Sequence, residues 1–133
     1  MRTIDRLTIH HSGAARAQTL ESIRHYHEGV IPYHLVIDGQ AVLHHTKPIE
    51  EAGAHDAGEN AQSIGLCLVG NNVALGQEWT EEQILRAKEV IHAFRIFWPE
   101  ARIQGHRDEG PGGPGTKDAT LCPGVEVKEV FHV

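Results

Sequence analysis

The nearly continuous apolar run Ser63-Ile64-Gly65-Leu66-Cys67-Leu68-Val69 gives the strongest indication of the fold. It lacks the alternation of apolar and polar residues that is typical of a strand with one exposed face. Such a run predicts a central strand that is covered on both faces, as in the sheets of α/β proteins. Within it, Cys67 is best interpreted as a small buried hydrophobic residue.

Four further segments are short, rich in β-branched, aromatic or apolar residues, and bounded by turn residues, as strands are. They are residues 6–10, 33–37, 41–44 and 102–104. The second and third flank Asp38-Gly39, a dipeptide typical of two-residue hairpin turns. We therefore expect these two segments to form a β-hairpin.

Two helices are predicted from capping residues and apolar spacing. Thr19 is a suitable N-cap for a helix that extends to about residue 27. Thr80-Glu81-Glu82-Gln83 is a capping box, followed by an apolar stripe at helical spacing that Pro99 brings to an end. Strands that alternate with helices predict an α/β fold: a single domain over residues 1–133, with a mixed central β-sheet flanked by helices.

The composition limits the classes of function. The chain has 133 residues, with 12 Lys and Arg against 18 Asp and Glu, and so a net charge of −6 with neutral histidine. This charge argues against nucleic acid as the principal ligand. No apolar run approaches the ~20 residues of a membrane span, and the first residues contain no secretory signal. We therefore expect a protein that is made in the cytoplasm and does not insert into a membrane.

Histidine is over-represented, with 11 residues, and imidazole is the commonest metal ligand in proteins. His10 ends the first predicted strand, His106 follows the last, and Cys122 lies in a Pro/Gly-rich loop that can fold back toward them. Two histidines and one cysteine are a known ligand set for catalytic zinc, with the fourth position open to water. Since the ends of distant strands can meet at one edge of a sheet, these three residues predict a zinc site there.

Other pairs of histidines are less suitable. His25 and His27 lie two positions apart on a helix and do not face one another. Adjacent strand residues point to opposite faces, so only one of His10 and His11 is expected to line a given cavity. Because 11 histidines allow many triples, a purely structural role is the alternative for any one of them.

A series of motifs occurs in one order along the chain: Ile9-His10-His11-Ser12, Tyr33-His34-Leu35-Val36-Ile37-Asp38-Gly39, Gly53-Ala54-His55, Ser63-Ile64-Gly65, Gly105-His106-Arg107-Asp108 and Thr120-Leu121-Cys122-Pro123-Gly124. The series resembles the zinc-dependent N-acetylmuramoyl-L-alanine amidases of type 2, which include T7-lysozyme-like phage endolysins and peptidoglycan recognition proteins. The resemblance extends from Ile4 to about Phe131. It implies a peptidoglycan hydrolase that cleaves the amide between N-acetylmuramic acid and the L-alanine of the stem peptide.

The resemblance also implies roles for individual residues. One zinc ion is expected on His10, His106 and Cys122, the set that the strand ends also indicate. Tyr33 is expected to be catalytic, as an orienting and oxyanion-stabilising group. Thr120 is the second catalytic candidate, because it lies where phage members usually carry a lysine and catalytic recognition proteins a threonine.

The segment between the last two ligands is longer than in many members of the family. The excess is the Gly/Pro-rich stretch 110–117, which leaves Lys117 as an alternative to Thr120. His11 and His55 are interpreted as substrate-binding residues, with an ordinary polar surface as the alternative.

The preferred interpretation is a phage or prophage endolysin, a monomer that reaches the cell wall through a holin or another release route. Its expected partner is peptidoglycan, both glycan strand and stem peptide. Two alternatives are compatible with the same resemblance: a non-catalytic peptidoglycan-binding module, and a bacterial amidase for wall recycling or remodelling. Cys122 favours an enzyme, because members that only recognise peptidoglycan commonly lack this ligand.

Overall fold

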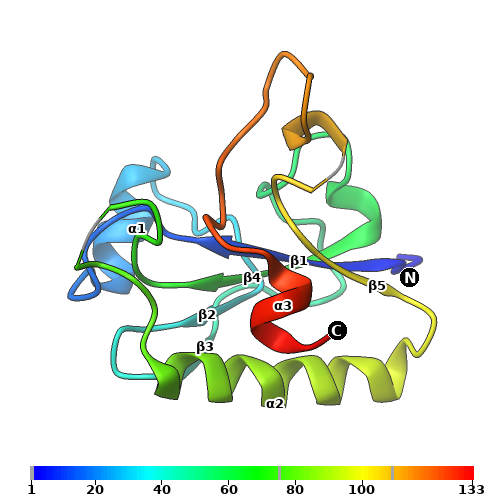
Figure 1. Cartoon of the computed structure of the whole chain (residues 1–133). Helices are drawn as coiled ribbons and strands as arrows, with labels where there is room; N and C mark the ends of the chain where they lie inside the picture. Colours follow the sequence, from blue (N-terminus) through cyan, green and yellow to red (C-terminus); the bar gives the residue numbers. More distant parts are fainter. Residues whose placement is uncertain (1, 75, 109) are drawn as a thin grey trace.

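The computed structural model describes residues 2–74, 76–108 and 110–133. It contains a five-stranded sheet with the strand order β3-β2-β4-β1-β5 (Figure 1). The strands are β1 (Arg6–His11), β2 (Leu35–Ile37), β3 (Leu43–His45), β4 (Ser63–Leu68) and β5 (Arg102–Gly105). Strands β1, β2, β4 and β5 are parallel, and β3 pairs antiparallel with β2. The predicted mixed sheet is therefore confirmed.

The apolar run forms β4, as predicted, at the centre of the sheet between β1 and β2. Every residue of this strand is buried, including Cys67. A strand in this position has both faces covered by side chains and helices, so it gains no advantage from polar residues on alternate positions. The apolar sequence and the central position thus have the same cause.

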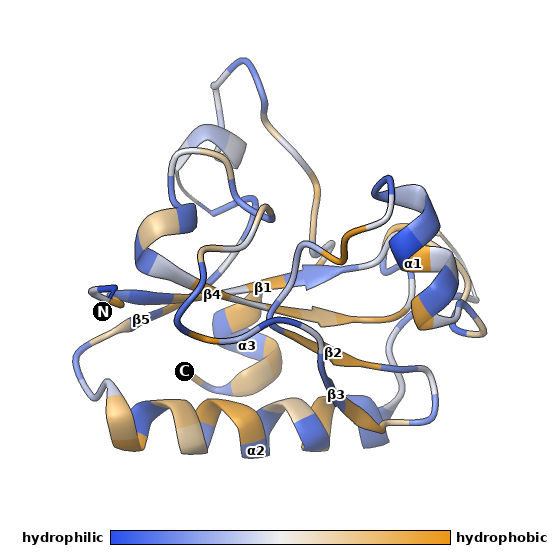
Figure 2. Cartoon of the chain, turned by 180° about the vertical axis from the view of Figure 1, so that it is seen from behind, coloured by the Kyte–Doolittle hydropathy of each residue, from blue (hydrophilic) through white to orange (hydrophobic). Residues whose placement is uncertain are grey.

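Three α-helices in the described ranges flank the sheet: α1 (Leu20–Tyr26), α2 (Glu81–Phe97) and α3 (Val127–Phe131); two short 3-10 helices lie at Asn60–Gln62 and Gly110–Gly112. Helices α2 and α3 cover one face of the sheet, whereas α1 lies on the other side (Figure 1). The larger apolar core lies under α2 and includes Phe94, and a smaller one under α1 includes Ile23. Strands β2 and β4 are largely orange, and α2 alternates in hydropathy, as amphipathic packing requires (Figure 2). No helix in the described ranges has the length and apolar character to cross a bilayer.

Both predicted helix starts are confirmed. Thr19 accepts a hydrogen bond from the amide of Ser22 at 3.1 Å and caps α1. Thr80 Oγ1 accepts from the amide of Gln83 at 3.2 Å, and Gln83 Oε1 accepts from the amide of Thr80 at 2.9 Å, so the capping box is complete. Helix α3 was not predicted, because it is too short to show a helical period.

The predicted two-residue hairpin turn is wrong. Strand β2 ends at Ile37 and β3 begins at Leu43, so a longer loop joins them. Asp38 Oδ1 organises this loop by accepting from the amides of Gln40 and Val42 at 2.9 and 3.0 Å. Gly39 is needed for a different reason: a Cβ there would collide with the backbone carbonyl of Arg16.

Candidate active site

The three candidate metal ligands meet at the carboxyl ends of β1 and β5. Each of His10, His106 and Cys122 offers one ligand atom, and these atoms all lie within 4.8 Å of one another. The Nδ1 atom of His10 lies 3.6 Å from the Sγ atom of Cys122. No other group of this kind occurs among the residues that the structure describes.

The sheet itself brings the two histidines together. Strands β1 and β5 are parallel neighbours in which Ile9 pairs with Gly105, and the amide of His106 donates to the carbonyl of Ile9 at 3.2 Å. Parallel strands end at the same edge of a sheet, which is where ligand sites of open α/β sheets form. The carbonyl of Cys122 accepts from the amide of Arg107 at 2.8 Å, which ties the C-terminal loop to this edge.

The ionisation states of these groups suit a metal cation. Burial, followed by the nearby imidazoles of His55 and His106, lowers the pKa of His10 well below its usual value, and burial lowers that of His106. Both rings are therefore neutral at pH 7 and have a lone pair to donate. Burial raises the pKa of Cys122 to about 12, so this thiol ionises only beside a positive charge such as a metal ion supplies. Two neutral imidazoles and one thiol form a donor set that fits zinc.

Tyr33 lies beside the candidate ligands. Its side chain is only 8% exposed, and its ring centroid is 5.1 Å from that of His10. Burial, followed by the proximity of Cys67 and Cys122, raises the pKa of Tyr33 well above its usual value. The phenol therefore keeps its proton at neutral pH, which suits a hydrogen-bond donor and not a general base.

A cavity of about 260 Å³ opens onto these groups. It is lined by His10, His11, Ser12, Gly13, His27, Pro32, Tyr33, Ala54, His55, His106 and Cys122. Both His10 and His11 line it, contrary to the strict alternation predicted for adjacent strand residues, because His11 is the last residue of β1, where the regular pleat ends. His27, which follows α1, also lines the cavity; the sequence predicts no role for it at a site, because no motif marks it.

His55 occupies a more enclosed position than a substrate-contacting residue needs. It is 7% exposed, and both of its ring nitrogens face protein groups. Burial, followed by the charges of neighbouring groups, lowers the pKa of His55 to about 3. His11 is less enclosed, and its Nδ1 atom accepts from the amide of Asn72 at 3.2 Å.

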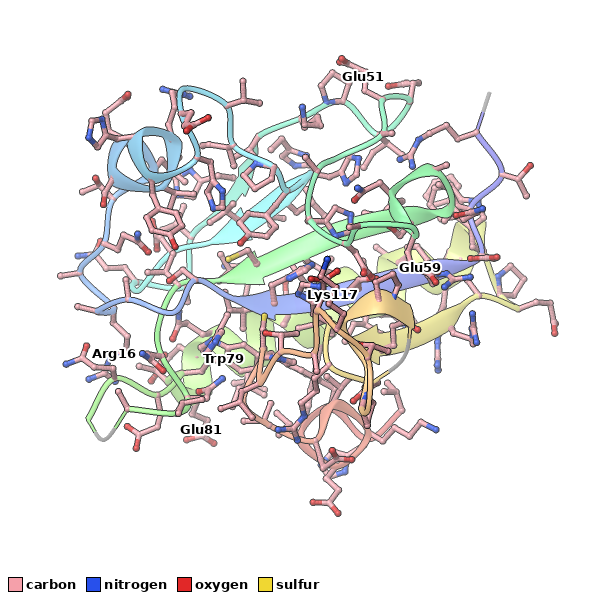
Figure 3. All side chains as sticks on the ribbon, turned by 90° about the horizontal axis from the view of Figure 1, so that it is seen from above. Arg16, Glu51, Glu59, Trp79, Glu81 and Lys117 are labelled. Atoms are coloured by element: carbon pink, nitrogen blue, oxygen red, sulfur yellow. The ribbon has the colours of Figure 1, made fainter. Side chains whose placement is uncertain are left out.

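Thr120 and Lys117, the alternative second catalytic groups, are not among the described residues that line the cavity. Thr120 Oγ1 accepts from the amide of Cys122 at 3.1 Å, so the threonine supports the backbone of a candidate ligand. Lys117 is exposed, on the loop that rises away from the sheet in Figure 1 and overlies its middle in the view from above (Figure 3).

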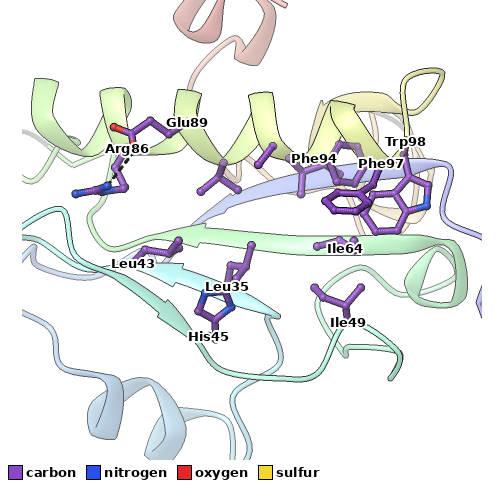
Figure 4. Close-up of a pocket in the computed structure, with 13 residues that line it drawn as sticks. Leu35, Leu43, His45, Ile49, Ile64, Arg86, Glu89, Phe94, Phe97 and Trp98 are labelled. Atoms are coloured by element: carbon purple, nitrogen blue, oxygen red, sulfur yellow. Dashed lines mark hydrogen bonds and ion pairs between the residues drawn. The ribbon is translucent and has the colours of Figure 1, made fainter.

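A second cavity of about 340 Å³ lies between α2 and the opposite face of the sheet (Figure 4). Its described lining is mainly apolar and includes Leu35, Phe94 and Trp98. The Arg86–Glu89 ion pair is among its few charged groups. Among the described residues, the one group that could hold a metal ion lies at the cavity that contains His10 and not at this one.

The fold and the site together define the class of protein. The family model described as N-acetylmuramoyl-L-alanine amidase matches residues 1–125, and the chain belongs to this family. An endolysin of Enterobacteria phage K11 is 29% identical over 111 residues, which cover 76% of this chain and 74% of that protein. An uncharacterized protein of Haemophilus influenzae is 35% identical over 86 residues, covering 62% and 72% of the two chains.

Solved structures show the same fold. The endolysin N-acetylmuramoyl-L-alanine amidase LysCS from Clostridium intestinale superposes with a TM-score of 0.82. The superposition covers 98% of this chain and 83% of LysCS, at 20% sequence identity. The arrangement of strands and helices is therefore retained at low sequence identity.

Proposed function

We propose that this protein is a zinc-dependent amidase that hydrolyses the bond between N-acetylmuramic acid and the L-alanine of the peptidoglycan stem peptide. The observation that carries the proposal is the convergence of His10, His106 and Cys122 in a cavity that also contains Tyr33. Membership of the amidase family and the similarity to phage endolysins support it. In this proposal residues 1–133 form one catalytic domain that acts as an endolysin after release to the cell wall.

His10, His106 and Cys122 are the residues that would hold the zinc ion. When bound there, the ion would lower the pKa of a water molecule toward ~7 and polarise the carbonyl group of the substrate. The two histidines contribute lone pairs without first having to lose a proton, because burial keeps both neutral. With the ion bound, Cys122 would contribute the negative charge that distinguishes this ligand set from three imidazoles.

Tyr33 would donate a hydrogen bond to the carbonyl oxygen of the scissile amide. Negative charge develops on this oxygen as the carbonyl carbon becomes tetrahedral, so a donor fixed beside it stabilises the transition state more than the ground state. The raised pKa of Tyr33 ensures that the proton is present. The ring is already buried, so little conformational freedom is lost when the bond forms.

Thr120 is proposed as a second, uncharged donor, and Lys117 as its alternative. The hydroxyl of Thr120 accepts from the amide of Cys122 and retains its own proton for another partner. His11 and the accessible edge of His55 are proposed to contact the glycan or the stem peptide. Because the chain has a net charge of −6, such specific contacts must provide affinity for an anionic wall.

Digestion of purified peptidoglycan, followed by mass spectrometry of the new ends, tests the proposal. We expect new L-alanine amino termini, which disappear with a chelator and return with zinc. New reducing sugar ends would instead indicate a glycosidase. Binding without new ends would indicate a recognition module, and activity confined to small soluble muropeptides would favour a recycling amidase.

The two cysteines provide a matched pair of variants. Cys122→Ala should abolish both hydrolysis and stoichiometric zinc binding. Cys67→Ala removes the same side chain from the buried centre of β4 and should retain the zinc stoichiometry. Full activity with bound zinc in Cys122→Ala would refute the ligand assignment.

A further inference from the structure

A chain of buried side chains leads from His10 into the protein, away from the cavity. The Nε2 atom of His10 lies 2.9 Å from Nδ1 of His55, and Nε2 of His55 lies 3.2 Å from Oγ of Ser63. The exposed fractions of these residues are 2%, 7% and 0%. Water therefore does not compete for these hydrogen bonds, and their direction is set by the protein and by what binds at His10.

When both rings are neutral, the hydrogen bonds that join His10, His55 and Ser63 can point in only two directions. In the first, His10 donates from Nε2 to His55, and His55 donates from its own Nε2 to Ser63. This direction leaves the lone pair of His10 on Nδ1, the atom 3.6 Å from Sγ of Cys122. In the second, Ser63 donates to His55, His55 donates to His10, and a proton on Nδ1 points toward Cys122. Only the first direction presents a lone pair to a metal ion.

The backbone of His55 is held by a single side chain. The Oδ1 atom of Asn60 accepts from the amide of His55 at 3.0 Å and from the amide of Asp56 at 2.9 Å. These adjacent residues approach both candidate histidine ligands, because Oδ1 of Asp56 lies 3.7 Å from Nε2 of His106. Asn60 thus fixes the segment that stands behind the metal site.

Two glycines make room for the ring of His55. A Cβ added at Gly53 or at Gly65 would lie 2.7 Å from ring atoms of His55. Real Cβ atoms do not approach this closely, so both positions need glycine as long as the ring stays in place. The ring is thus confined from two sides while its nitrogens are hydrogen-bonded at both ends.

We propose that His55 is a positioning residue of the metal site. By accepting a hydrogen bond from Nε2–H of His10, it keeps the Nδ1 lone pair of His10 free for the ion, while Ser63 and Asn60 hold His55 in place. The inference rests on the proposed metal site and assigns to His55 a role beyond contact with substrate. Hydrogen-bonded groups behind ligand histidines commonly change metal affinity by 10–100-fold when they are removed.

Zinc affinity, measured on the whole chain by competition with a chromogenic chelator, tests the proposal. His55→Leu removes the acceptor and should weaken zinc binding by about 10–100-fold. His55→Asn places an amide oxygen near the original Nδ1 and should lose less affinity than His55→Leu. His34→Leu is the matched control, because it removes a fully buried ring that contacts His55 and bonds to the carbonyl of Glu51 and the amide of Gly65, but not to His10.

Nitrogen-15 NMR of the metal-free protein provides a second readout. The wild type should show His10 protonated on Nε2, and His55→Leu should show a mixture of both tautomers. The proposal is overturned if His55→Leu binds zinc as tightly as the wild type, or loses no more affinity than His34→Leu. A wild-type chain that binds no zinc would instead refute the metal site of the proposed function.

Discussion

Replacing Gly65 by alanine is expected to destabilise the protein through its effect on a single ring. The new Cβ would lie 2.7 Å from Cγ and Cδ2 of His55 and 2.9 Å from its Nδ1. The ring cannot retreat into solvent, because it is only 7% exposed and both of its nitrogens have protein partners. Either β4 or the ring must therefore shift, and the bond from His10 lengthens.

The size of the effect follows from two opposing terms. Overpacking of a filled interior costs about 1–3 kcal/mol. Alanine recovers about 0.5–1 kcal/mol, because glycine in a strand loses more backbone entropy on folding. We expect a net loss in the free energy of unfolding of about 0–2.5 kcal/mol for Gly65→Ala. In a His55→Ala background the obstacle is gone, so the same change should stabilise by about 0.5–1 kcal/mol.

Urea denaturation of four proteins measures this coupling: the wild type, the two single variants and the double variant. These four proteins form a double-mutant cycle. Its interaction energy should equal the cost of packing the new Cβ against the ring of His55, about 1–3 kcal/mol. Equal costs of Gly65→Ala in both backgrounds would refute the reasoning, because the ring of His55 would then not be the obstacle. Zinc affinity of Gly65→Ala should fall along with its stability.

Three further predictions concern other parts of the molecule. Tyr33→Phe should lower turnover about 10²–10³-fold while zinc content, measured by atomic absorption, stays the same; unchanged turnover would remove Tyr33 from the mechanism. Thr80→Ala should lower the free energy of unfolding by about 1 kcal/mol in urea denaturation, and an unchanged midpoint would contradict the role of the capping box. Burial raises the pKa of Asp38, but hydrogen bonds from His44 and two backbone amides outweigh it, so the folded-state pKa lies below the ordinary 3.8. Asp38→Asn should therefore have a lower free energy of unfolding than the wild type at pH 7. This difference in free energy should disappear as the pH falls from 3.8 through the folded-state pKa. If the difference persists in acid, the charge of the carboxylate is not its cause.

The parts of the fold that were predictable are those with local signals. Strand β4 is apolar because of its central position, and α2 begins at a capping box whose members lie three residues apart. The hairpin loop was mispredicted because Gly39 serves the approach of Arg16, which is distant in sequence. Helix α3 depends on packing against β5 and α2 and has no sequence period of its own.

The residues of the candidate site also divide into those that the sequence predicts and those that it does not. His10, His106 and Cys122 were found because strand ends and a Pro/Gly loop are visible in the sequence, and the structure brings all three together. The enclosure of His55 was not predictable, because it arises from spatial contacts with Ser63 and with glycines on other segments. The sequence shows which side chains could bind a metal ion, but the hydrogen-bond partners of a buried ring such as that of His55 become known only from the tertiary structure.

The position of β1 between β4 and β5 has a consequence for how the protein is made. His10 leaves the ribosome early, and Cys122 follows 112 residues later. Strand β1 cannot acquire its neighbour β5 until residue 105 has been synthesised, and parallel pairings between such distant segments form slowly. A chain that is cut or stalled before His106 contains only His10 of the three candidate ligands, so the candidate site can be complete only after Cys122 has been synthesised.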